Sequence, residues 1–259
     1  MYLKNIDFSI YSSIKIGQIE NVLVLEKEDE IPSDRYLVGG ANNLLIAPSP
    51  RPLMLLGKDF AYIESKGDIL EVGAATPGGK LLSFAKKHDI GGFEFMAKLP
   101  GTIGGMTAMN AGVKEHEIFG ILKSVKIHDK WMDKEEIEHG YRYADLPGIV
   151  TAVRFENSEG FDDKLAKNLD NLRLSQPSQP SAGSAFKNPP GDFAGRLIES
   201  VGLKGYREGG MAWSEMHANF LVNLGNGRFD EAIKLIELAQ KRVFEEYGVR
   251  LEREIIVID

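Results

Sequence analysis

The stretch 99–112, Leu-Pro-Gly-Thr-Ile-Gly-Gly-Met-Thr-Ala-Met-Asn-Ala-Gly, lies mid-chain and contains four glycines and no charged residue. Inside a helix or strand a glycine costs roughly 0.5–1 kcal/mol relative to alanine, so this composition predicts a loop. Because glycine lets backbone N–H groups approach a ligand closely, the loop is expected to wrap a flat, partly anionic ligand. A glycine-rich turn in a β-rich core is the alternative that the stretch alone leaves open.

Length and composition set the broad class of the protein. The chain has 259 residues, of which 43% are hydrophobic, enough for one large domain or a few small ones. A formal net charge of −7 argues against a nucleic-acid partner. The absence of cysteine excludes disulfides, Cys-ligated zinc and iron–sulfur clusters. Neither a signal peptide nor an apolar run of about 18 residues is present, so a cytoplasmic protein without membrane insertion is expected.

A second glycine-rich segment follows an apolar strand predicted at 35–38. It consists of Gly39, Gly40, Ala41, Asn42, Asn43 and Leu44. Consecutive backbone N–H groups in such a strand-to-loop element can form an anion-binding nest. Gly-Gly and Asn-Asn are also good turn pairs, so an ordinary β-turn is equally compatible with this segment.

Short β-rich runs dominate the chain up to residue 156, and helical periodicity is more frequent after it. Strands are predicted at 14–16, 21–25, 35–38, 54–56, 61–63, 69–73, 124–128, 137–143, 149–155, 219–224 and 251–259. Helices are predicted at 78–88, 162–174, 192–201 and 230–247, the third capped by Asp192 and the fourth ended by Gly248. An acidic turn is predicted at 26–33 and a polar loop at 175–184.

Two polar segments contain candidate functional side chains. Arg142 follows Tyr141 in a predicted strand, where an arginine most often lies on the surface. Ser184 stands close in sequence to Lys187 and Asn188, a combination that suits proton donation or phosphate binding, although a turn serine is the commoner case. The residues alone leave both explanations open for each segment.

Several familiar catalytic motifs are incomplete or absent. Gly225-Asn226-Gly227 precedes a predicted helix like the start of a dinucleotide fingerprint, but Asp230 stands where the third glycine belongs. That carboxylate would repel a pyrophosphate, so a Rossmann site is rejected. The five histidines show no metal-ligand spacing, and neither a Gly-x-Ser-x-Gly elbow nor a Walker loop occurs. A metal site, a serine hydrolase and a P-loop ATPase are therefore not expected.

Six segments in order resemble the UDP-N-acetylenolpyruvoylglucosamine reductase family, flavoenzymes that make UDP-N-acetylmuramate for peptidoglycan. They are Val38–Leu45, Leu99–Gly112, Tyr141-Arg142, Gly183–Pro189, His217–Asn223 and Gly248–Glu254. The resemblance covers nearly the whole chain and implies an α+β fold. Two FAD-binding subdomains, 1–56 and 57–158, would form a fold of the vanillyl-alcohol-oxidase type. A substrate-binding α+β domain, 159–247, would follow, and a C-terminal strand, 248–259, would return to the active site.

The resemblance also implies roles for individual residues. The two loops would hold FAD through Gly39, Gly40, Ala41, Asn42, Asn43, Leu44, Pro100, Gly101, Thr102, Ile103, Gly104, Gly105, Ala108, Asn110 and Gly112. Tyr141, Lys187 and Asn188 would place the substrate, UDP-N-acetylglucosamine enolpyruvate. Arg142 and Glu254 would stabilise its carboxylate end, and Ser184 would supply a proton. No metal is implied.

The reaction implied by the resemblance has two halves. NADPH would reduce FAD and leave, and the enolpyruvyl group would then accept a hydride from flavin N5. The negative charge that develops beside the substrate carboxylate suits a fixed guanidinium, and a hydroxyl can protonate a carbanion-like centre. The chain is expected to act as a monomer in bacterial cell-wall synthesis, on which cell shape and division depend.

The sequence departs from the family's pattern in several places. Ala41 stands where the first loop usually has serine, and Tyr143-Ala144 replace an aspartate or asparagine followed by serine. Val113-Lys114-Glu115 replace alanine-tyrosine-glycine, and only a turn fits between residues 25 and 35. The length leaves little space for the substrate-covering loop of longer members. A compact member with a more open site is therefore expected.

Two other functions stay open from the sequence. One is an alcohol or sugar oxidase on the same fold, although such enzymes usually have a larger substrate domain and often attach flavin through His or Cys. The other is a non-catalytic FAD- or nucleotide-binding protein. The presence of Arg142, Ser184 and Glu254 in separate motifs favours an enzyme over mere binding.

Overall fold

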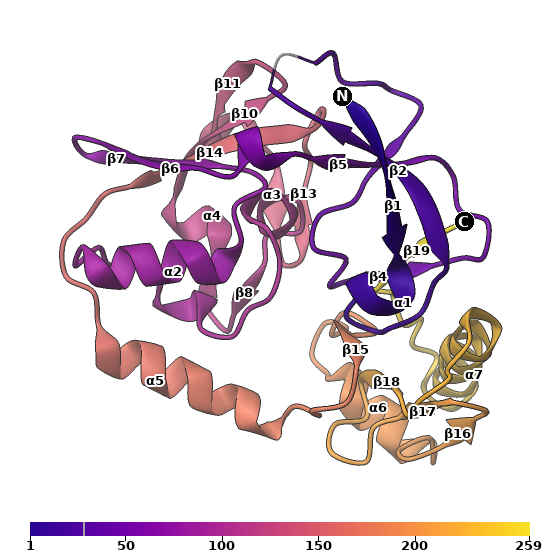
Figure 1. Ribbon diagram of the computed structural model, residues 1–259. Helices are drawn as coiled ribbons and strands as arrows, with labels where there is room; N and C mark the ends of the chain where they lie inside the picture. Colours follow the sequence, from indigo (N-terminus) through magenta and orange to yellow (C-terminus); the bar gives the residue numbers. More distant parts are fainter. Residues whose placement is uncertain (28) are drawn as a thin grey trace. The chain divides into compact units, whose positions relative to one another are not determined.

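The computed structural model describes residues 1–27 and 29–259, so Glu28 of the predicted acidic turn lies outside the described residues (Figure 1). The chain forms two compact units. The first comprises Met1–Lys4, Val22–Gly40 and Pro52–Arg173, and the second comprises Asn5–Asn21, Ala41–Arg51 and Leu174–Asp259. The N-terminal segment and the first glycine-rich loop each contribute to both units. The resemblance implies two FAD-binding subdomains, a substrate-binding domain and a returning C-terminal strand, and this division stays a prediction.

A four-stranded sheet in the order β1-β2-β5-β3 leads the chain to the first glycine-rich loop. Its strands are β1 (Tyr2–Asp7), β2 (Ile19–Leu25), β3 (Tyr36–Leu37) and β5 (Leu53–Leu56). β5 pairs in parallel with both β2 and β3, and its buried Met54 packs in one cluster with Phe60 of the 3₁₀ turn η1 (Lys58–Phe60). The N–H of Val38 donates to Met54 O at 2.8 Å, so the pairing continues to the residue before Gly39.

The larger sheet of the first unit is antiparallel and has the order β11-β10-β14-β7-β6. Its strands are β6 (Ile63–Lys66), β7 (Ile69–Gly73), β10 (Leu122–Ile127), β11 (Lys130–Asp133) and β14 (Val150–Glu156). The other helical elements of this unit are α2 (Gly78–Lys87), η2 (Glu94–Met96), α3 (Ile103–Ala108), α4 (Ile118–Ile121), η3 (Lys134–Glu136) and α5 (Asp163–Leu172). Leu81 and Ala85, one turn apart on α2, are buried with Val153 and Phe155 of β14, as expected for an amphipathic helix against a β-branched and aromatic strand.

Two very short hairpins of the first unit contain predicted site residues, Gly112 in one and Tyr141 and Arg142 in the other. One pairs β8 (Gly112–Val113) with β9 (His116–Glu117), and the other pairs β12 (His139–Gly140) with β13 (Tyr143–Ala144). Each is closed by two residues, and one of the two has a positive φ, 54° at Lys114 and 55° at Arg142. The second hairpin therefore presents Tyr141 and Arg142 in a tight turn.

The second unit is built on an antiparallel sheet in the order β15-β18-β17-β16. Its strands are β15 (Ser181–Ser184), β16 (Arg207–Glu208), β17 (Met211–Trp213) and β18 (Phe220–Asn223), and a separate parallel pair joins β4 (Leu44–Ile46) to β19 (Ile256–Ile258). The helices are α1 (Phe8–Tyr11), α6 (Ala194–Ser200) and α7 (Phe229–Tyr247), and the 3₁₀ turn η4 (Arg173–Ser175) lies where the second unit begins. Phe186 and Trp213 stack in the core with their ring centres 5.9 Å apart.

Many predicted elements are confirmed, as is the α+β class. The helices expected at 78–88, 162–174 and 230–247 correspond to α2, α5 and α7, and Gly248 ends α7 with a φ of 67°. The strands expected at 69–73, 124–128, 149–155 and 219–224 correspond to β7, β10, β14 and β18. The helices among them have apolar residues at helical spacing, and the strands are short runs rich in apolar residues.

The prediction that 99–112 is a loop throughout is wrong, because α3 lies within it. Thr102 begins this helix by accepting the N–H of Gly105 on Oγ1, and Ile103 and Met106 are buried. A Cβ on Gly104 would lie 2.8 Å from the Cβ of Ala74, so the glycine lets the helix approach closely. Burial of the apolar residues outweighs the low helix propensity of glycine here.

Other differences also reflect tertiary contacts. The strand expected at 14–16 is wrong, because Ile14 and Ile16 enter the core from an irregular segment. The segment expected at 137–143 is a hairpin rather than one strand, and the loop expected at 175–184 ends in strand β15. Asp192 is not the N-cap of α6; Phe193 holds that position, and Asp192 pairs with Arg196. None of strands β1, β4, β8, β9, β11, β16 and β17 is predicted from the sequence.

Candidate active site

The first glycine-rich loop has side chains bonded within the second unit. Ala41 has a φ of 49° and its carbonyl accepts the N–H of Ser13 at 3.1 Å, while Asn42 Nδ2 donates to Ser13 Oγ at 2.7 Å. Asn43 Nδ2 donates to the carbonyl of Glu254 at 2.8 Å. Among the hydrogen bonds of the described chain, none is donated by the backbone N–H groups of residues 40–43. The loop therefore keeps a run of main-chain donors, as an anion-binding nest requires.

Several backbone N–H groups of the second glycine-rich loop already donate to acceptors within the first unit. The N–H of Ile103 donates to Thr76 O at 2.9 Å and that of Gly104 to Ala74 O at 2.8 Å, while Gly105 donates to Thr102 Oγ1. Asn110 is 1% exposed and its side chain bonds to protein groups at both ends. The N–H groups of residues 103–105 and the Asn110 side chain therefore already have protein partners. The cofactor role of this loop stays a prediction.

Arg142 is held firmly within the first unit. Its Nη2 donates to the carbonyl of Gly112 at 3.0 Å, and its Nη1 lies 3.4 Å from Glu117 Oε1. The guanidinium carbon lies 5.0 Å from the ring centre of Tyr141, whose side chain is half exposed. A guanidinium in a fixed plane is suited to bind a carboxylate through two parallel hydrogen bonds.

The structure brings Ser184 and Glu254 onto adjacent segments of the second unit. Ser184 ends β15, and the carbonyl of the next residue, Ala185, accepts the N–H of Glu254 at 2.9 Å. Phe186 forms a β-bridge with Arg253, and the N–H of Lys187 donates to Glu252 O at 2.9 Å. Two segments about 70 residues apart in sequence thus run side by side, while the strand expected at 251–259 is confined to β19.

Lys187 and Asn188 already have protein partners in this segment. Lys187 Nζ lies 2.6 Å from the carboxylate of Glu252, and Asn188 Oδ1 accepts the N–H of Ala194 at the start of α6. His217 accepts the N–H of Asn219 on Nδ1 at 3.2 Å, and burial lowers its pKa below the ordinary value. A neutral imidazole there acts as an acceptor that fixes the turn before β18.

Two residues in these networks were not among the predicted site residues. Glu117 contacts the Arg142 guanidinium, and no local pattern in the sequence marks it. Asn219 lies within the segment His217–Asn223, but its contact with Phe186 depends on the pairing of two distant segments. Only the three-dimensional structure reveals either role.

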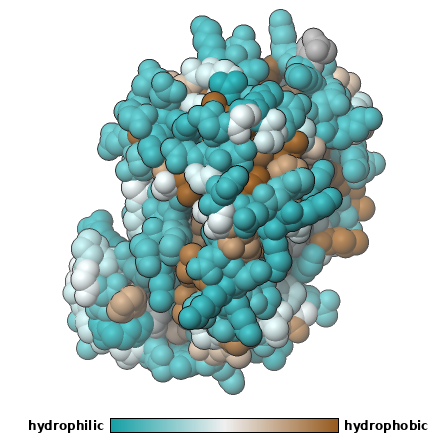
Figure 2. Space-filling view, turned by 90° about the vertical axis from the view of Figure 1, so that its left-hand side faces the viewer, coloured by the Kyte–Doolittle hydropathy of each residue, from teal (hydrophilic) through white to brown (hydrophobic). Residues whose placement is uncertain are grey.

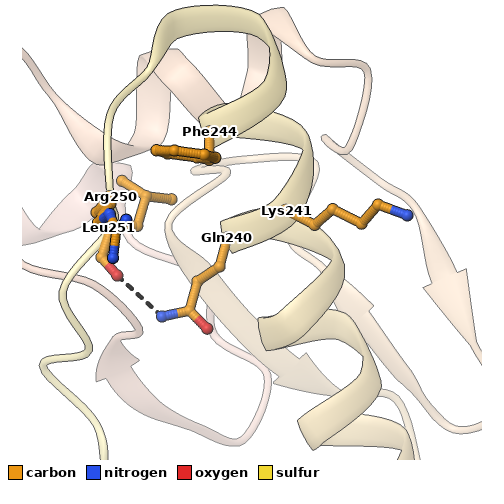
Figure 3. A pocket seen from close by; sticks show the side chains of 5 residues that line it. All are labelled: Gln240, Lys241, Phe244, Arg250 and Leu251. Carbon is orange, nitrogen blue, oxygen red and sulfur yellow. Dashed lines mark hydrogen bonds between the residues drawn. The ribbon is translucent and has the colours of Figure 1, made fainter.

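The described surface adds little to this site. Hydrophilic residues cover most of the face in Figure 2, with apolar residues in small groups between them. A shallow hollow of about 330 Å³ is lined by Gln240, Lys241, Phe244, Arg250 and Leu251 (Figure 3). Gln240 Nε2 donates to Leu251 O at 2.9 Å across it. None of these residues is a predicted site residue.

Two further properties of the described residues concern metal binding and membrane spanning. In the described part of the chain, no three His, Cys, Asp or Glu side chains gather closely enough to bind a metal ion. None of the described helices combines the length and apolar character needed to cross a lipid bilayer.

The chain is similar to known proteins over its whole length. The family model described as UDP-N-acetylenolpyruvoylglucosamine reductase, C-terminal domain, matches residues 176–258. The reductase of that name from Helicobacter pylori is 47% identical over 253 residues, which cover 98% of each chain. Its counterpart from Campylobacter jejuni is 44% identical over 258 residues, or 98% of this chain and 99% of that one. The crystal structure of the Thermus caldophilus enzyme covers 100% of both chains with a TM-score of 0.87 and 32% identity.

Proposed function

The chain belongs to the UDP-N-acetylenolpyruvoylglucosamine reductase family, and on that premise we propose that it reduces UDP-N-acetylglucosamine enolpyruvate to UDP-N-acetylmuramate. We propose NADPH as the reductant and FAD as the resident cofactor. The proposed setting is peptidoglycan precursor synthesis in the bacterial cytoplasm, with the chain acting as a monomer. Membership in a family of reductases makes the protein an oxidoreductase.

The first glycine-rich loop fits the phosphates of a dinucleotide cofactor. The backbone N–H groups of residues 40–43 donate to no protein acceptor in the described chain, and these residues are Gly, Ala, Asn and Asn. Gly101 and Thr102 of the second loop would add contacts. Bound FAD would take a hydride from NADPH and pass it to the enolpyruvyl group. The protein's own part is to hold the cofactor and to manage the charge and the proton on the substrate.

Three side chains are proposed to act on the substrate. Arg142 binds the carboxylate and stabilises the negative charge that spreads onto it when the hydride arrives. Glu254, as the neutral acid, hydrogen-bonds the same end of the substrate, because an ionised carboxylate would repel the charge that develops there. Ser184 gives a proton to the carbon next to the carboxylate, and positioned acids of this kind are worth on the order of 10²–10⁴-fold in rate.

The main support is the pairing of the Ser184 and Glu254 segments. The hydrogen bond from Glu254 N to Ala185 O joins the segment of the proposed carboxylic acid to the residue after the proposed proton donor, which supports a shared role for the two side chains. The amide of Asn43 on the Glu254 carbonyl links the same segment to the proposed cofactor loop. Lys187 and Tyr141 are proposed to contact the substrate, the lysine after leaving its surface partner Glu252.

Absorbance spectra of the purified protein test this proposal. A flavin spectrum is expected that bleaches with NADPH under anaerobic conditions and returns when the enolpyruvyl sugar nucleotide is added. Arg142→Ala should bleach normally but recover slowly, whereas Arg207→Ala, at an exposed position, should behave as wild type. Failure to bleach would support a binding protein, and rapid reoxidation by O₂ coupled to alcohol turnover would support an oxidase.

A further inference from the structure

We propose that Glu117 is a positioning residue for Arg142, and that Asn110 holds Glu117 in that role. This inference rests on the proposed function, which assigns the substrate carboxylate to Arg142. It concerns only groups of the first unit. Neither Glu117 nor the side chain of Asn110 needs to touch substrate for it to hold.

The backbone of Arg142 is in a conformation that needs outside support. Arg142 is the second residue of the two-residue turn between β12 and β13, and its φ of 55° lies in the left-handed region. That region costs a residue with a side chain roughly 1–2 kcal/mol and usually favours glycine or asparagine. Such a conformation persists where surrounding contacts determine it, and the guanidinium supplies those contacts here.

The guanidinium meets two acceptors from one cross-strand pair. Gly112 and Glu117 are directly opposite each other in the β8–β9 hairpin. The carbonyl of Gly112 accepts from Nη2 at 3.0 Å, and Glu117 Oε1 lies 3.4 Å from Nη1. A carbonyl and a carboxylate at fixed spacing set both the position and the plane of the group. A Cβ on Gly112 would lie 2.1 Å from His116 O, so only glycine allows this hairpin to close.

Asn110 fixes the other oxygen of the same carboxylate. Its Nδ2 donates to Glu117 Oε2 at 2.8 Å and to Gly140 O at 2.9 Å, and its Oδ1 accepts the N–H of Phe119 at 3.1 Å. Gly140 belongs to β12, next to the turn that carries Arg142. One buried amide therefore ties the carboxylate to the base of the hairpin that presents the arginine.

The effect on the reaction follows from this geometry. A guanidinium stabilises developing charge best when it needs no reorganisation as the charge forms. Loss of Glu117 frees the side chain to move, so the substrate-reduction step slows while binding and oxidation of NADPH stay unchanged. The expected loss in the rate of that step is about 10–100-fold, the range that one charge-assisted hydrogen bond contributes.

Stopped-flow measurement of both half-reactions tests the proposal. Glu117→Ala should bleach with NADPH at the wild-type rate and return slowly with the enolpyruvyl substrate. Glu115→Ala is the matched control, because it lies in the same hairpin with its side chain 76% exposed and makes no contact with Arg142. The double variant Glu117→Ala/Arg142→Ala should be no slower than Arg142→Ala alone, since the two residues act as a unit.

The outcomes separate this inference from the proposed function. If wild-type protein fails to reduce the substrate, the proposed function fails and the inference fails with it. If wild type is active and Glu117→Ala matches Glu115→Ala, or if the losses in the double variant multiply, only the inference is overturned. A merely structural role would slow both half-reactions alike and also overturns it. If Glu117→Ala does not fold, Glu117→Gln is used, which keeps one acceptor oxygen and should show the same selective loss in smaller degree.

Discussion

Asn219 offers the sharpest test of how the segment carrying Ser184 is held. Its side chain is 3% exposed and faces the backbone of Phe186. Oδ1 accepts the N–H of Phe186 at 3.1 Å and Nδ2 donates to Phe186 O at 2.8 Å. The Asn219 carbonyl also accepts the N–H of Ala185 at 2.8 Å. The amide thus acts like one more peptide group in the sheet, and Asn219→Ala removes it.

The cost can be estimated from the groups left behind. Phe186 is fully buried, so the substitution leaves one N–H and one C=O without partner or water. Each such group costs about 1–3 kcal/mol, which gives about 2–6 kcal/mol of lost unfolding free energy. With a urea m-value of about 2 kcal/mol per M, the midpoint should fall by about 1–3 M.

Fluorescence of Trp213 in a Trp131→Phe background provides the assay. The sequence has two tryptophans, and Trp213 is buried against Phe186, so its signal follows the second unit. Asn188→Ala is the control, because it removes an exposed amide that accepts one backbone N–H and should cost about 1 kcal/mol or less. Equal midpoints for the two variants would refute the reasoning, since burial would then not set the cost.

Three more outcomes are expected. In stopped flow, Ser184→Ala should keep flavin reduction by NADPH but slow substrate reduction on the order of 10²–10⁴-fold. Ser181→Ala on the same strand should slow neither step. A normal second half-reaction in Ser184→Ala would remove Ser184 from its role. Gly112→Ala should lower the thermal midpoint by the equivalent of about 1–3 kcal/mol, because the added Cβ would meet the carbonyl oxygen of His116. At Gly140 a Cβ meets nothing within 4 Å, so Gly140→Ala should change the midpoint little. Burial lowers the pKa of His217 from 6.5, so the unfolded chain binds the proton first and stability should fall as the pH drops below 6.5. In His217→Gln, the urea midpoint should depend less steeply on pH in this range. An unchanged pH dependence would contradict this reasoning.

The long helices could be predicted because their apolar residues recur at helical spacing. In α7, Ala232, Ile236, Ala239 and Val243 share one face, and that face is buried. The segment 99–112 could not be assigned in this way, because its helix depends on Ala74 lying where Gly104 can approach it. Local propensity described the glycines correctly, but burial of their neighbours decided the outcome.

Some residues of the candidate site could be predicted from the sequence, and others could not. Ser184 and Glu254 could be singled out because each lies in a segment that resembles a family motif. Their adjacency could not be derived from periodicity, since it arises from a bridge between Phe186 and Arg253. Glu117 could not be singled out at all, because its partner Arg142 is 25 residues away and no spacing rule connects two separate hairpins.

Three asparagines show how a side-chain amide can order the irregular segments of the candidate site. Asn43 donates to the carbonyl of Glu254, Asn110 to the carboxylate of Glu117, and Asn219 to the carbonyl of Phe186. A side-chain amide carries both a donor and an acceptor, so it can replace a missing strand partner where the backbone turns away. All three lie in motifs that resemble the family, and in each the amide nitrogen bonds to the protein itself. The same residues that mark the family in sequence therefore hold the segments of the candidate site in place, and a substitution there should disturb that local order before it reaches the two large cores.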